Sequence, residues 1–459
     1  MTNARATARR WGFFLSVALV GADLSSCASK GDGGATGSGG ARASGGSGGE
    51  GEAKGTGGAA PGSGGAAPGS GGAGPGSGGA PAGGTGGPGG GGAGGGAALP
   101  PPLCPTSWTG SPGRPQLTDA SAACFTAAHY LAQAGMVGAL VTDNWDPTAA
   151  PGDASAFTAT YTVAADGSGT HTTVQAAVAA AKASGSTARV YIRVMPGTYR
   201  ELVCVDGSVP ITLYSSESDA AKTTVVFGNY NGKTVDSTMT NPCSVPSKTT
   251  YGTSDSTTVF VKAPRFEALN LTFANDLDES TAANTSAVQA VALTTQGDQN
   301  VFRNVRLLGN QDTLQVKTSS VSVVARAYFK DCTIEGDTDF VFGRGTAVFD
   351  GCTLKYVAGR KTNSTHLAAS TEAANTFGFL IVASKITGDA SLSGTTYLGR
   401  AWDDSSGTAP NGQVLIRETE IGAHIVVASP WTTSTASRAF DADGNRLYEY
   451  RNTGPGAAP

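Results

Sequence analysis

The sequence predicts an all-β protein built as a right-handed parallel β-helix, in which short strands stack coil upon coil. Three observations lead to this prediction: a short apolar triplet recurs from residue 266 onward, its surroundings are rich in β-branched and aromatic residues, and Gly, Asn and Asp gather at its flanks. Because the triplet is constant while the intervals between its copies vary, we expect insertions to be confined to the turns of one solenoid. A set of unrelated strands in a mixed sheet is the alternative.

The triplet begins with a bulky apolar residue, continues with a medium-sized residue three positions later and ends with a third residue two positions after that. Its copies are Phe266/Leu269/Leu271, Phe302/Val305/Leu307, Phe329/Cys332/Ile334, Phe349/Cys352/Leu354, Ile381/Ser384/Ile386 and Ile416/Thr419/Ile421. Residues at equal distances from the first member are therefore predicted to stack in neighbouring coils.

The regions on either side of the repeat complete the domain plan. An alanine-rich amphipathic helix over 173–183 is predicted to cap the open end of the solenoid. The segment 188–202 is predicted to form a strand, a turn and a second strand. We expect residues 103–156 to be an N-terminal extension with a short helix that packs against the capping helix. The solenoid domain is then assigned to 157–440 and a C-terminal tail to 441–459.

The first 27 residues resemble a bacterial lipoprotein signal. Arginines precede an apolar run over 11–22 that is too short to remain as a transmembrane helix. The letters "LSSC" are similar to the lipoprotein cleavage box, with Cys27 as the lipidated residue, and an ordinary secretory signal is the alternative. Residues 28–102 are nearly free of large apolar side chains, so they are predicted to be a disordered tether. We expect an exported chain that is lipid-anchored to the cell envelope, at the outer membrane, or is secreted.

Composition excludes several classes of partner. The net charge of −4 and the 14% of charged residues argue against nucleic acid, and a polybasic patch for a membrane surface is absent. The N-terminal lipid is therefore the expected membrane contact. The cysteine spacing is not that of a zinc site and the four histidines are scattered, so no metal is expected.

Six cysteines besides Cys27 suit three disulfides in an exported chain. Cys332 and Cys352 hold the same place in successive copies of the triplet. Their Cα atoms are expected at the interstrand spacing of about 4.8 Å, which lies inside the range for a disulfide, so we predict this bridge. The pairing of the remaining four stays open; these are Cys104, Cys124, Cys204 and Cys243.

The same repeat places two carboxylates side by side. Ten residues after Phe302 stands Asp312, and ten residues after Phe329 stands Asp339. Like charges one coil apart do not both ionise cheaply, so one aspartic acid is expected to be protonated beside an ionised partner. That difference is what a nucleophile and a general acid/base require.

Further polar residues surround this pair in the sequence. Gln311 in "GNQDTL" and Gln289 in "VQAVAL" offer amide donors for an oxyanion, although an internal amide ladder is an alternative. The stretch "YLGRAW" supplies Arg400, whose guanidinium can hold a carboxylate ionised, and Trp402, whose indole suits stacking on a sugar ring.

These four motifs, "VQAVAL", "GNQDTL", "GDTDFVFG" and "YLGRAW", resemble carbohydrate esterases of the pectin methylesterase type, and the similarity covers roughly 157–435. The resemblance implies a right-handed parallel β-helix that uses no metal or organic cofactor. It also implies that the chain hydrolyses methyl esters of homogalacturonan, giving methanol and acidic pectin. Methyl-esterified pectin is then the expected partner, and a monomer the expected state.

The resemblance implies a role for each matching position. Asp339 corresponds to the nucleophile, Asp312 to the acid/base and Arg400 to the arginine that hydrogen-bonds the nucleophile. The oxyanion donors would be Gln311 and Gln289. The substrate contacts would be Trp402, Phe342 and Thr253. The pair Cys332 and Cys352 also resembles a disulfide of bacterial members.

Departures from the family pattern concern specificity. Ala401 stands where a proline is usual and is expected to relax a turn, and Thr338 stands where valine is common. The expanded loop 315–327 is expected to flank the groove. Arg360 or Lys361 is a candidate for a further cation that faces the substrate.

Three other functions remain open from the sequence. A polygalacturonate glycosidase would also use paired carboxylates on a β-helix. A thioesterase-like outer-membrane lipoprotein is compatible with the N-terminal signal. A pectin-binding protein without catalysis is the third.

Overall fold

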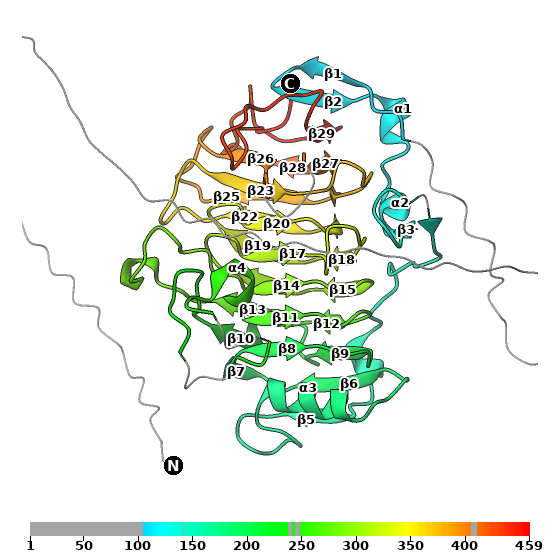
Figure 1. Ribbon diagram of the computed structural model, residues 1–459, viewed down its shortest axis with the longest axis vertical. Helices are drawn as coiled ribbons and strands as arrows, with labels where there is room; N and C mark the ends of the chain where they lie inside the picture. Colours follow the sequence, from blue (N-terminus) through cyan, green and yellow to red (C-terminus); the bar gives the residue numbers. More distant parts are fainter. Residues whose placement is uncertain (1–103, 140, 237–240, 244–247, 405–410) are drawn as a thin grey trace, which may run out of the picture. The chain divides into compact units, whose positions relative to one another are not determined.

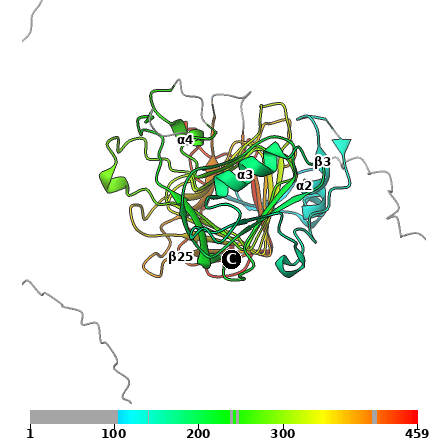
Figure 2. The same ribbon diagram turned by 90° about the horizontal axis from the view of Figure 1, so that it is seen from below.

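A computed structural model describes residues 104–459 except 140, 237–240, 244–247 and 405–410. The expectations for the signal segment, for Cys27 and for the tether therefore lie outside the described residues. In the rest, three long sheets wrap around a common core and stack as a parallel β-helix (Figure 1). Figure 2, along the stack, shows helix α3 lying across one end. The predicted fold class is confirmed.

The first sheet holds twelve strands in the order β1-β2-β29-β27-β24-β21-β18-β15-β12-β9-β6-β5. Its strands are β1 Trp108–Ser111, β2 Arg114–Leu117, β5 Tyr161–Val163, β6 Val190–Val194, β9 Ile211–Tyr214, β12 Glu267–Leu269, β15 Asn300–Arg303, β18 Arg326–Lys330, β21 Thr346–Asp350, β24 Phe379–Val382, β27 Gln413–Arg417 and β29 Arg446–Tyr450.

The second sheet holds eight strands and the third holds seven, all paired in parallel. The second consists of β7 Gly197–Arg200, β10 Thr223–Phe227, β13 Thr272–Asn275, β16 Arg306–Leu308, β19 Thr333–Gly336, β22 Thr353–Tyr356, β25 Lys385–Gly388 and β28 Glu420–Ile421. The third consists of β8 Val203–Val205, β11 Val259–Val261, β14 Leu293–Thr295, β17 Leu314–Val316, β20 Val341–Gly343, β23 Thr365–Ala369 and β26 Tyr397–Ala401.

The remaining elements are short. The helices are α1 Asp119–Ala122, α2 Ala127–Ala132, α3 Val174–Ala183 and α4 Gly252–Asp255, with 3₁₀ turns at Ala154–Ala156, Ala220–Lys222 and Glu279–Thr281. Strands β3 Gln133–Ala134 and β4 Val141–Thr142 form a separate antiparallel pair. Strand β29 lies in the segment 441–459, so the first sheet continues into the expected tail.

Helix α3 forms where the sequence predicts a cap. The Thr173 side chain accepts a hydrogen bond from the backbone N–H of Ala176, and the Glu201 carboxylate accepts those of Val174 and Gln175, both at 2.8 Å. These bonds satisfy donors that a helix N-terminus leaves free. The helix buries one face, which consists of Val174, Ala177, Val178 and Ala181. This face covers the end of the hydrophobic core.

The apolar triplets stack as predicted from the second copy onward. Phe302, Phe329 and Phe349 are register partners, and their successive ring centroids lie 4.7 and 4.8 Å apart. The first copy is wrong by two residues, because Ala268 and not Phe266 pairs with Phe302. A shift of two preserves which face of the strand is buried, so the apolar pattern alone did not reveal the error.

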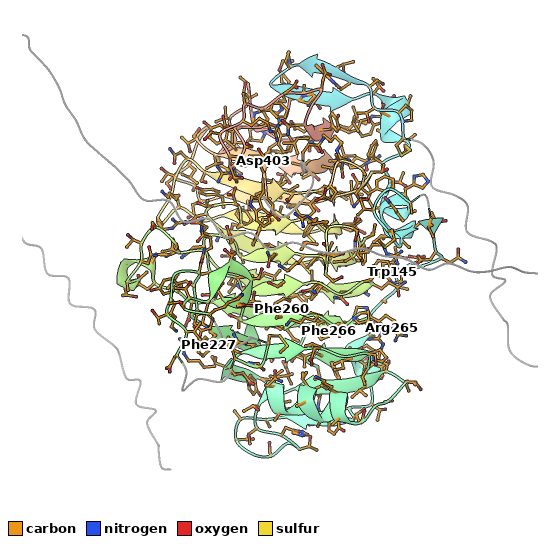
Figure 3. All side chains as sticks on the ribbon, viewed as in Figure 1. Trp145, Phe227, Phe260, Arg265, Phe266 and Asp403 are labelled. Carbon is orange, nitrogen blue, oxygen red and sulfur yellow. A yellow bond between two sulfur atoms is a disulfide. The ribbon has the colours of Figure 1, made fainter. Side chains whose placement is uncertain are left out.

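The N-terminal extension does not pack where the sequence led us to expect. Helix α2 lies against β18, β21 and β24 of the first sheet, and the β1–β2 hairpin lies beside β29, at the opposite end from α3 (Figure 1). Two sets of contacts hold it there: Phe125, Tyr130 and Leu131 belong to an apolar cluster with the first sheet, and Arg326 is held by Asp143 of the extension at 2.6 Å and by Asp298 at 2.8 Å. Trp145 (labelled in Figure 3) covers the same guanidinium, 5.1 Å from its ring centroid.

Two disulfides form, between Cys104 and Cys124 and between Cys204 and Cys243.

The predicted bridge between Cys332 and Cys352 is wrong: both thiols are buried and free. They do stack in successive coils, but parallel register keeps the two Cβ atoms about 4.8 Å apart, and a disulfide needs about 3.8 Å. Each thiol instead donates a hydrogen bond to a backbone carbonyl of the preceding coil, Cys332 to Phe302 and Cys352 to Phe329, both at 3.4 Å.

Candidate active site

The two aspartates occupy equivalent corners between the second and third sheets. Asp312 lies just before β17 and Asp339 just before β20, and these strands pair with Leu314 opposite Val341. A parallel bridge joins Gln311 to Thr338 as well. The predicted alignment of the carboxylates, one coil apart, is therefore confirmed.

Both corner aspartates have a left-handed backbone, with φ of 67° at Asp312 and 45° at Asp339. Asp and Asn enter this region more readily than other side chains with a Cβ. The Asp312 N–H donates to the Thr338 carbonyl at 3.0 Å, and the Asp339 N–H donates to the Thr365 carbonyl at 2.8 Å. The corners are thus fixed by the stack of coils, which supports precise placement of both carboxyl groups.

Arg400, on β26 two coils further along, binds the Asp339 carboxylate with two donors. Nε donates to Oδ1 at 3.0 Å and Nη2 to Oδ2 at 2.5 Å. The Thr365 hydroxyl donates a short hydrogen bond to Oδ1 as well. The Asp339 side chain is 9% exposed and that of Arg400 27%. Since charge-assisted bidentate pairs favour the ionised form, this arrangement holds Asp339 as a carboxylate that still borders open space.

Asp312 has the opposite environment. Burial raises its pKa well above the usual range, and the charge of Asp339 raises it further, while Arg400 and Arg360 act against this shift. The environment of Asp312 therefore favours its protonated form, whereas Asp339 is bound by the guanidinium of Arg400.

The two glutamines present their amides to the same space. The Gln289 Oε1 accepts from Asn231 Nδ2 at 2.9 Å, and the Gln311 Oε1 accepts from Arg360 Nη2 at 3.4 Å. With both oxygens engaged, the Nε2 groups are the free ends, and among the described residues neither has an acceptor. Two NH₂ groups are thus available as donors where an oxyanion would develop.

These side chains border one cavity of about 290 Å³. Its lining consists of Thr253, Gln289, Gln311, Asp312, Asp339, Phe342, Ala368, Arg400, Trp402 and Thr435. The Phe342 and Trp402 rings lie 5.4 Å apart, edge to face, and form an apolar wall. The Asn231 amide also donates to the Thr253 hydroxyl at 3.3 Å. Every site residue predicted from the four motifs, and Thr253, lies at this cavity.

The strand register explains which side chains of the third sheet point away from the core. Gln315, Phe342, Ala368 and Arg400 are successive partners on the third sheet. Alternate residues of a strand face opposite sides, so their neighbours point into the core and these four point outward. The third sheet therefore supplies both the core and the site.

Thr365 is the contact that sequence reasoning missed. It is the partner of Asp339 in the next coil, since Val341 pairs with Leu367. Counting ten residues from Phe349 leads to Gly359 instead, because an insertion precedes the corner in that coil. Asn231 follows β10 in a loop that carries no recognisable motif.

Two sequence-based expectations around the site need correction. Ala401 does not lie in a turn but ends strand β26, where it pairs with Ala369. The 315–327 loop borders Trp402 only through its first residues, and its later part pairs with the N-terminal extension through Val323 and Met136. The expectation of a further cation that faces the substrate stays a prediction: Arg360, which is paired with Asp337 at 2.6 Å, and Lys361 both line a neighbouring cavity of about 520 Å³.

The described part of the chain contains no cluster of His, Cys, Asp and Glu that could hold a metal ion. None of the helices described is long and apolar enough to cross a membrane.

Both the sequence and the fold of this chain are similar to those of known proteins. The family model described as Pectinesterase matches residues 160–459. A pectinesterase of Ralstonia solanacearum is 47% identical over 369 residues, covering 76% of this chain and 93% of the relative. The structure of rice weevil pectin methyl esterase aligns with a TM-score of 0.66 and 35% identity, covering 77% of this chain and all of the weevil chain. The putative acyl-CoA thioester hydrolase YbhC of Escherichia coli is 30% identical over 408 residues, covering 79% of this chain and 93% of YbhC.

Proposed function

Because this chain belongs to the pectinesterase family, we propose that Asp339 is the nucleophile and Asp312 the acid/base with which it removes methyl esters from pectin. The hydrolysis of pectin methyl esters is the activity of the family, and the Ralstonia solanacearum and rice weevil relatives are named for it. The observation that carries the assignment of roles is the contrast between the aspartates: Arg400 binds Asp339 with two donors, and burial raises the pKa of Asp312.

In the first step, an Asp339 oxygen attacks the carbonyl carbon of the ester and a new C–O bond forms. The carbonyl oxygen becomes an oxyanion that accepts hydrogen bonds from the free amide ends of Gln289 and Gln311. As the tetrahedral intermediate collapses, the bond to the methoxy oxygen breaks and Asp312 gives its proton to that oxygen. Methanol leaves, and Asp339 is joined to the galacturonate carbonyl as an anhydride.

In the second step, the ionised Asp312 takes a proton from a water molecule while the water oxygen attacks the galacturonate carbonyl. The bond to Asp339 breaks and returns Asp339 to its carboxylate, while Asp312 is protonated again. Ester and water are thus converted to acid and methanol. Trp402 and Phe342 supply an apolar wall on which a sugar ring can rest.

The decisive experiment compares methanol release from highly methylated pectin by the wild type and by Asp339→Asn. We expect the wild type to release methanol and the variant to lose at least about a thousandfold in kcat. Asp331→Asn is the matched control, because Asp331 also has a left-handed backbone, with φ of 54°, but lies at the corner between the first and second sheets. Equal rates for Asp339→Asn and the wild type would refute the assignment.

The same assay separates the alternatives. A glycosidase would lower the viscosity of the pectin without releasing methanol, and a non-catalytic pectin-binding protein would bind without turnover. The similarity to YbhC makes a thioester the relevant competing substrate. Release of coenzyme A from an acyl-CoA faster than methanol from pectin, lost in Asp339→Asn, would move the substrate assignment to thioesters and leave the catalytic assignment intact.

We also propose, from the sequence alone, that Cys27 carries a lipid that anchors the enzyme to the cell envelope, with residues 28–102 as the tether and a monomeric enzyme at its end. Cys27→Ser should move the activity from the membrane fraction to the soluble fraction. Activity that stays with the membrane in this variant would refute the anchor.

A further inference from the structure

We propose that Arg360 is a positioning residue that fixes the Gln311 carboxamide with its NH₂ group toward the active-site cavity. The inference rests on the oxyanion role proposed above for Gln311. Arg360 itself is absent from the residues that line that cavity. It lines the neighbouring cavity instead, so its effect on this site would pass through Gln311 and through its charge.

Arg360 is a rigid donor. Its Nη2 and Nε donate to the two carboxylate oxygens of Asp337, at 2.6 and 3.1 Å, and Glu279 lies 3.5 Å from Nε. Asp337 is only 1% exposed and the Arg360 side chain 23%. A bidentate pair with a buried carboxylate fixes the plane of the guanidinium and leaves it little freedom to follow a moving neighbour.

The same Nη2 reaches the Gln311 Oε1 at 3.4 Å and the Thr338 hydroxyl at 3.4 Å. A carboxamide has an acceptor at one end and donors at the other, so an amide whose oxygen faces a cation must present its NH₂ group on the other side. The reversed orientation would bring that NH₂ group against the guanidinium, which is unfavourable. Arg360 thereby selects the orientation that the oxyanion needs.

The other glutamine has an equivalent arrangement with a different donor. The Gln289 oxygen accepts from Asn231, at 2.9 Å, so its NH₂ group is also the free end. Each glutamine is thus oriented through its carboxamide oxygen, Gln289 by the neutral amide of Asn231 and Gln311 by the cation of Arg360. Only the cation also acts electrostatically on the acid/base, because the charge of Arg360 opposes the rise in the pKa of Asp312.

Arg344 provides a matched control. It is also an arginine held by two carboxylates, Asp404 at 2.7 Å and Glu372 at 3.3 Å, and its side chain is 11% exposed. Its Nη2 donates to Asp404, and Arg344 is not among the charges that shift the pKa of Asp312. Replacing Arg344 removes a similar ion-paired group and leaves the oxyanion donors as they are.

The experiment measures methanol release by Arg360→Gln, Arg360→Lys and Arg344→Gln, with kcat, KM and the pH profile of kcat/KM determined for each. Losing a complete oxyanion donor costs about a hundredfold or more in kcat, so losing only its orientation should cost Arg360→Gln about tenfold, with KM within about twofold. The alkaline limb of the profile should move to higher pH, because removing a nearby cation raises the pKa of the acid.

Arg360→Lys separates orientation from charge. Lysine keeps the positive charge but lacks the planar fork that binds Asp337 and Gln311 together, so kcat should fall while the alkaline limb stays in place. Arg344→Gln should change neither quantity per folded molecule. If Arg360→Gln does not fold, Arg360→Lys still tests the orientation through kcat.

Arg360→Gln behaving like Arg344→Gln would overturn the inference, and so would a raised KM at unchanged kcat, which would make Arg360 a substrate-binding group. Failure of the proposed function is a separate outcome. In that case Asp339→Asn would be as active as the wild type, whereas failure of this inference alone leaves Asp339→Asn inactive.

Discussion

Arg326 and Arg400 each hold carboxylates, but they lie on different sheets and their donors are used differently. Arg326, on the first sheet beneath the N-terminal extension, is fully buried and spends all five N–H donors on Asp143, Asp298 and the Leu131 carbonyl. Arg400, on the third sheet, spends two donors on Asp339 and stays 27% exposed. In the first arrangement every N–H donor of the arginine is used, and the N-terminal extension is held against the first sheet. The second fixes a charge and leaves it accessible to a substrate.

Arg326→Met should produce the largest effect, and on stability alone. It removes five charge-assisted hydrogen bonds, but Asp143 and Asp298 are 37% and 35% exposed and can be rehydrated, so we expect a loss of about 3 kcal/mol. Thermal unfolding of the variant should begin at lower temperature, while methanol release per folded molecule at low temperature stays unchanged. A lowered kcat with unchanged stability would contradict the distinction between Arg326, which stabilises the fold, and Arg400, which serves catalysis.

Arg400→Lys tests the role of the active-site arginine in catalysis. A lysine keeps the charge but binds Asp339 through one point, so the nucleophile loses its fixed orientation and kcat should fall about a hundredfold. The melting temperature should stay close to that of the wild type, because the side chain is partly exposed. Circular dichroism melts and initial rates, measured on the same preparation, test both expectations. An unchanged kcat would contradict the role of Arg400 in orienting Asp339.

The pH dependence of catalysis should follow the pKa of Asp312 in the active site and not that of Asp143 in the N-terminal extension. Burial raises the pKa of Asp143 too, but the hydrogen bonds from Arg326, Trp145 and Gln299 and the charge of Arg326 together outweigh it, and the pKa is lowered. Asp312 keeps a raised pKa. As a general acid it must be protonated, so kcat/KM should persist through mildly acidic pH and fall about tenfold per pH unit above its pKa. A profile that already falls near pH 4, where an ordinary aspartic acid ionises, would contradict this assignment.

Thr365→Val should give the smallest effect. It removes one of three donors to the Asp339 carboxylate and keeps the branched shape within β23. We expect kcat to fall about tenfold, which corresponds to about 1.4 kcal/mol, and Thr365→Ser to restore most of it. Thr346→Val is the matched control on the first sheet, since the Thr346 hydroxyl donates only to the Phe377 carbonyl.

The sequence was sufficient wherever a coil repeats without interruption. Between Phe302 and Val341 the interval from apolar anchor to corner is constant, so Asp312 and Asp339 could be aligned by counting. In the next coil an insertion precedes the corner, and Thr365 was missed. The position of the extension was also beyond reach, because Arg326 and Asp143 are 183 residues apart and nothing in either segment reveals the pairing. The free thiols show a further limit: position in a repeat gives proximity, and a disulfide also requires converging Cβ atoms.

The order of the coils has a consequence for how activity is acquired during folding. Asp339 and Arg400 are 61 residues apart in the chain but only two strands apart in the third sheet, since β23 lies between β20 and β26. Solenoids fold through contacts between neighbouring repeats, so such a site closes by local steps and needs no distant segment to arrive first. Because activity requires β20, β23 and β26 to be stacked together, regain of methanol release during refolding should report the docking of these three coils, wherever folding begins.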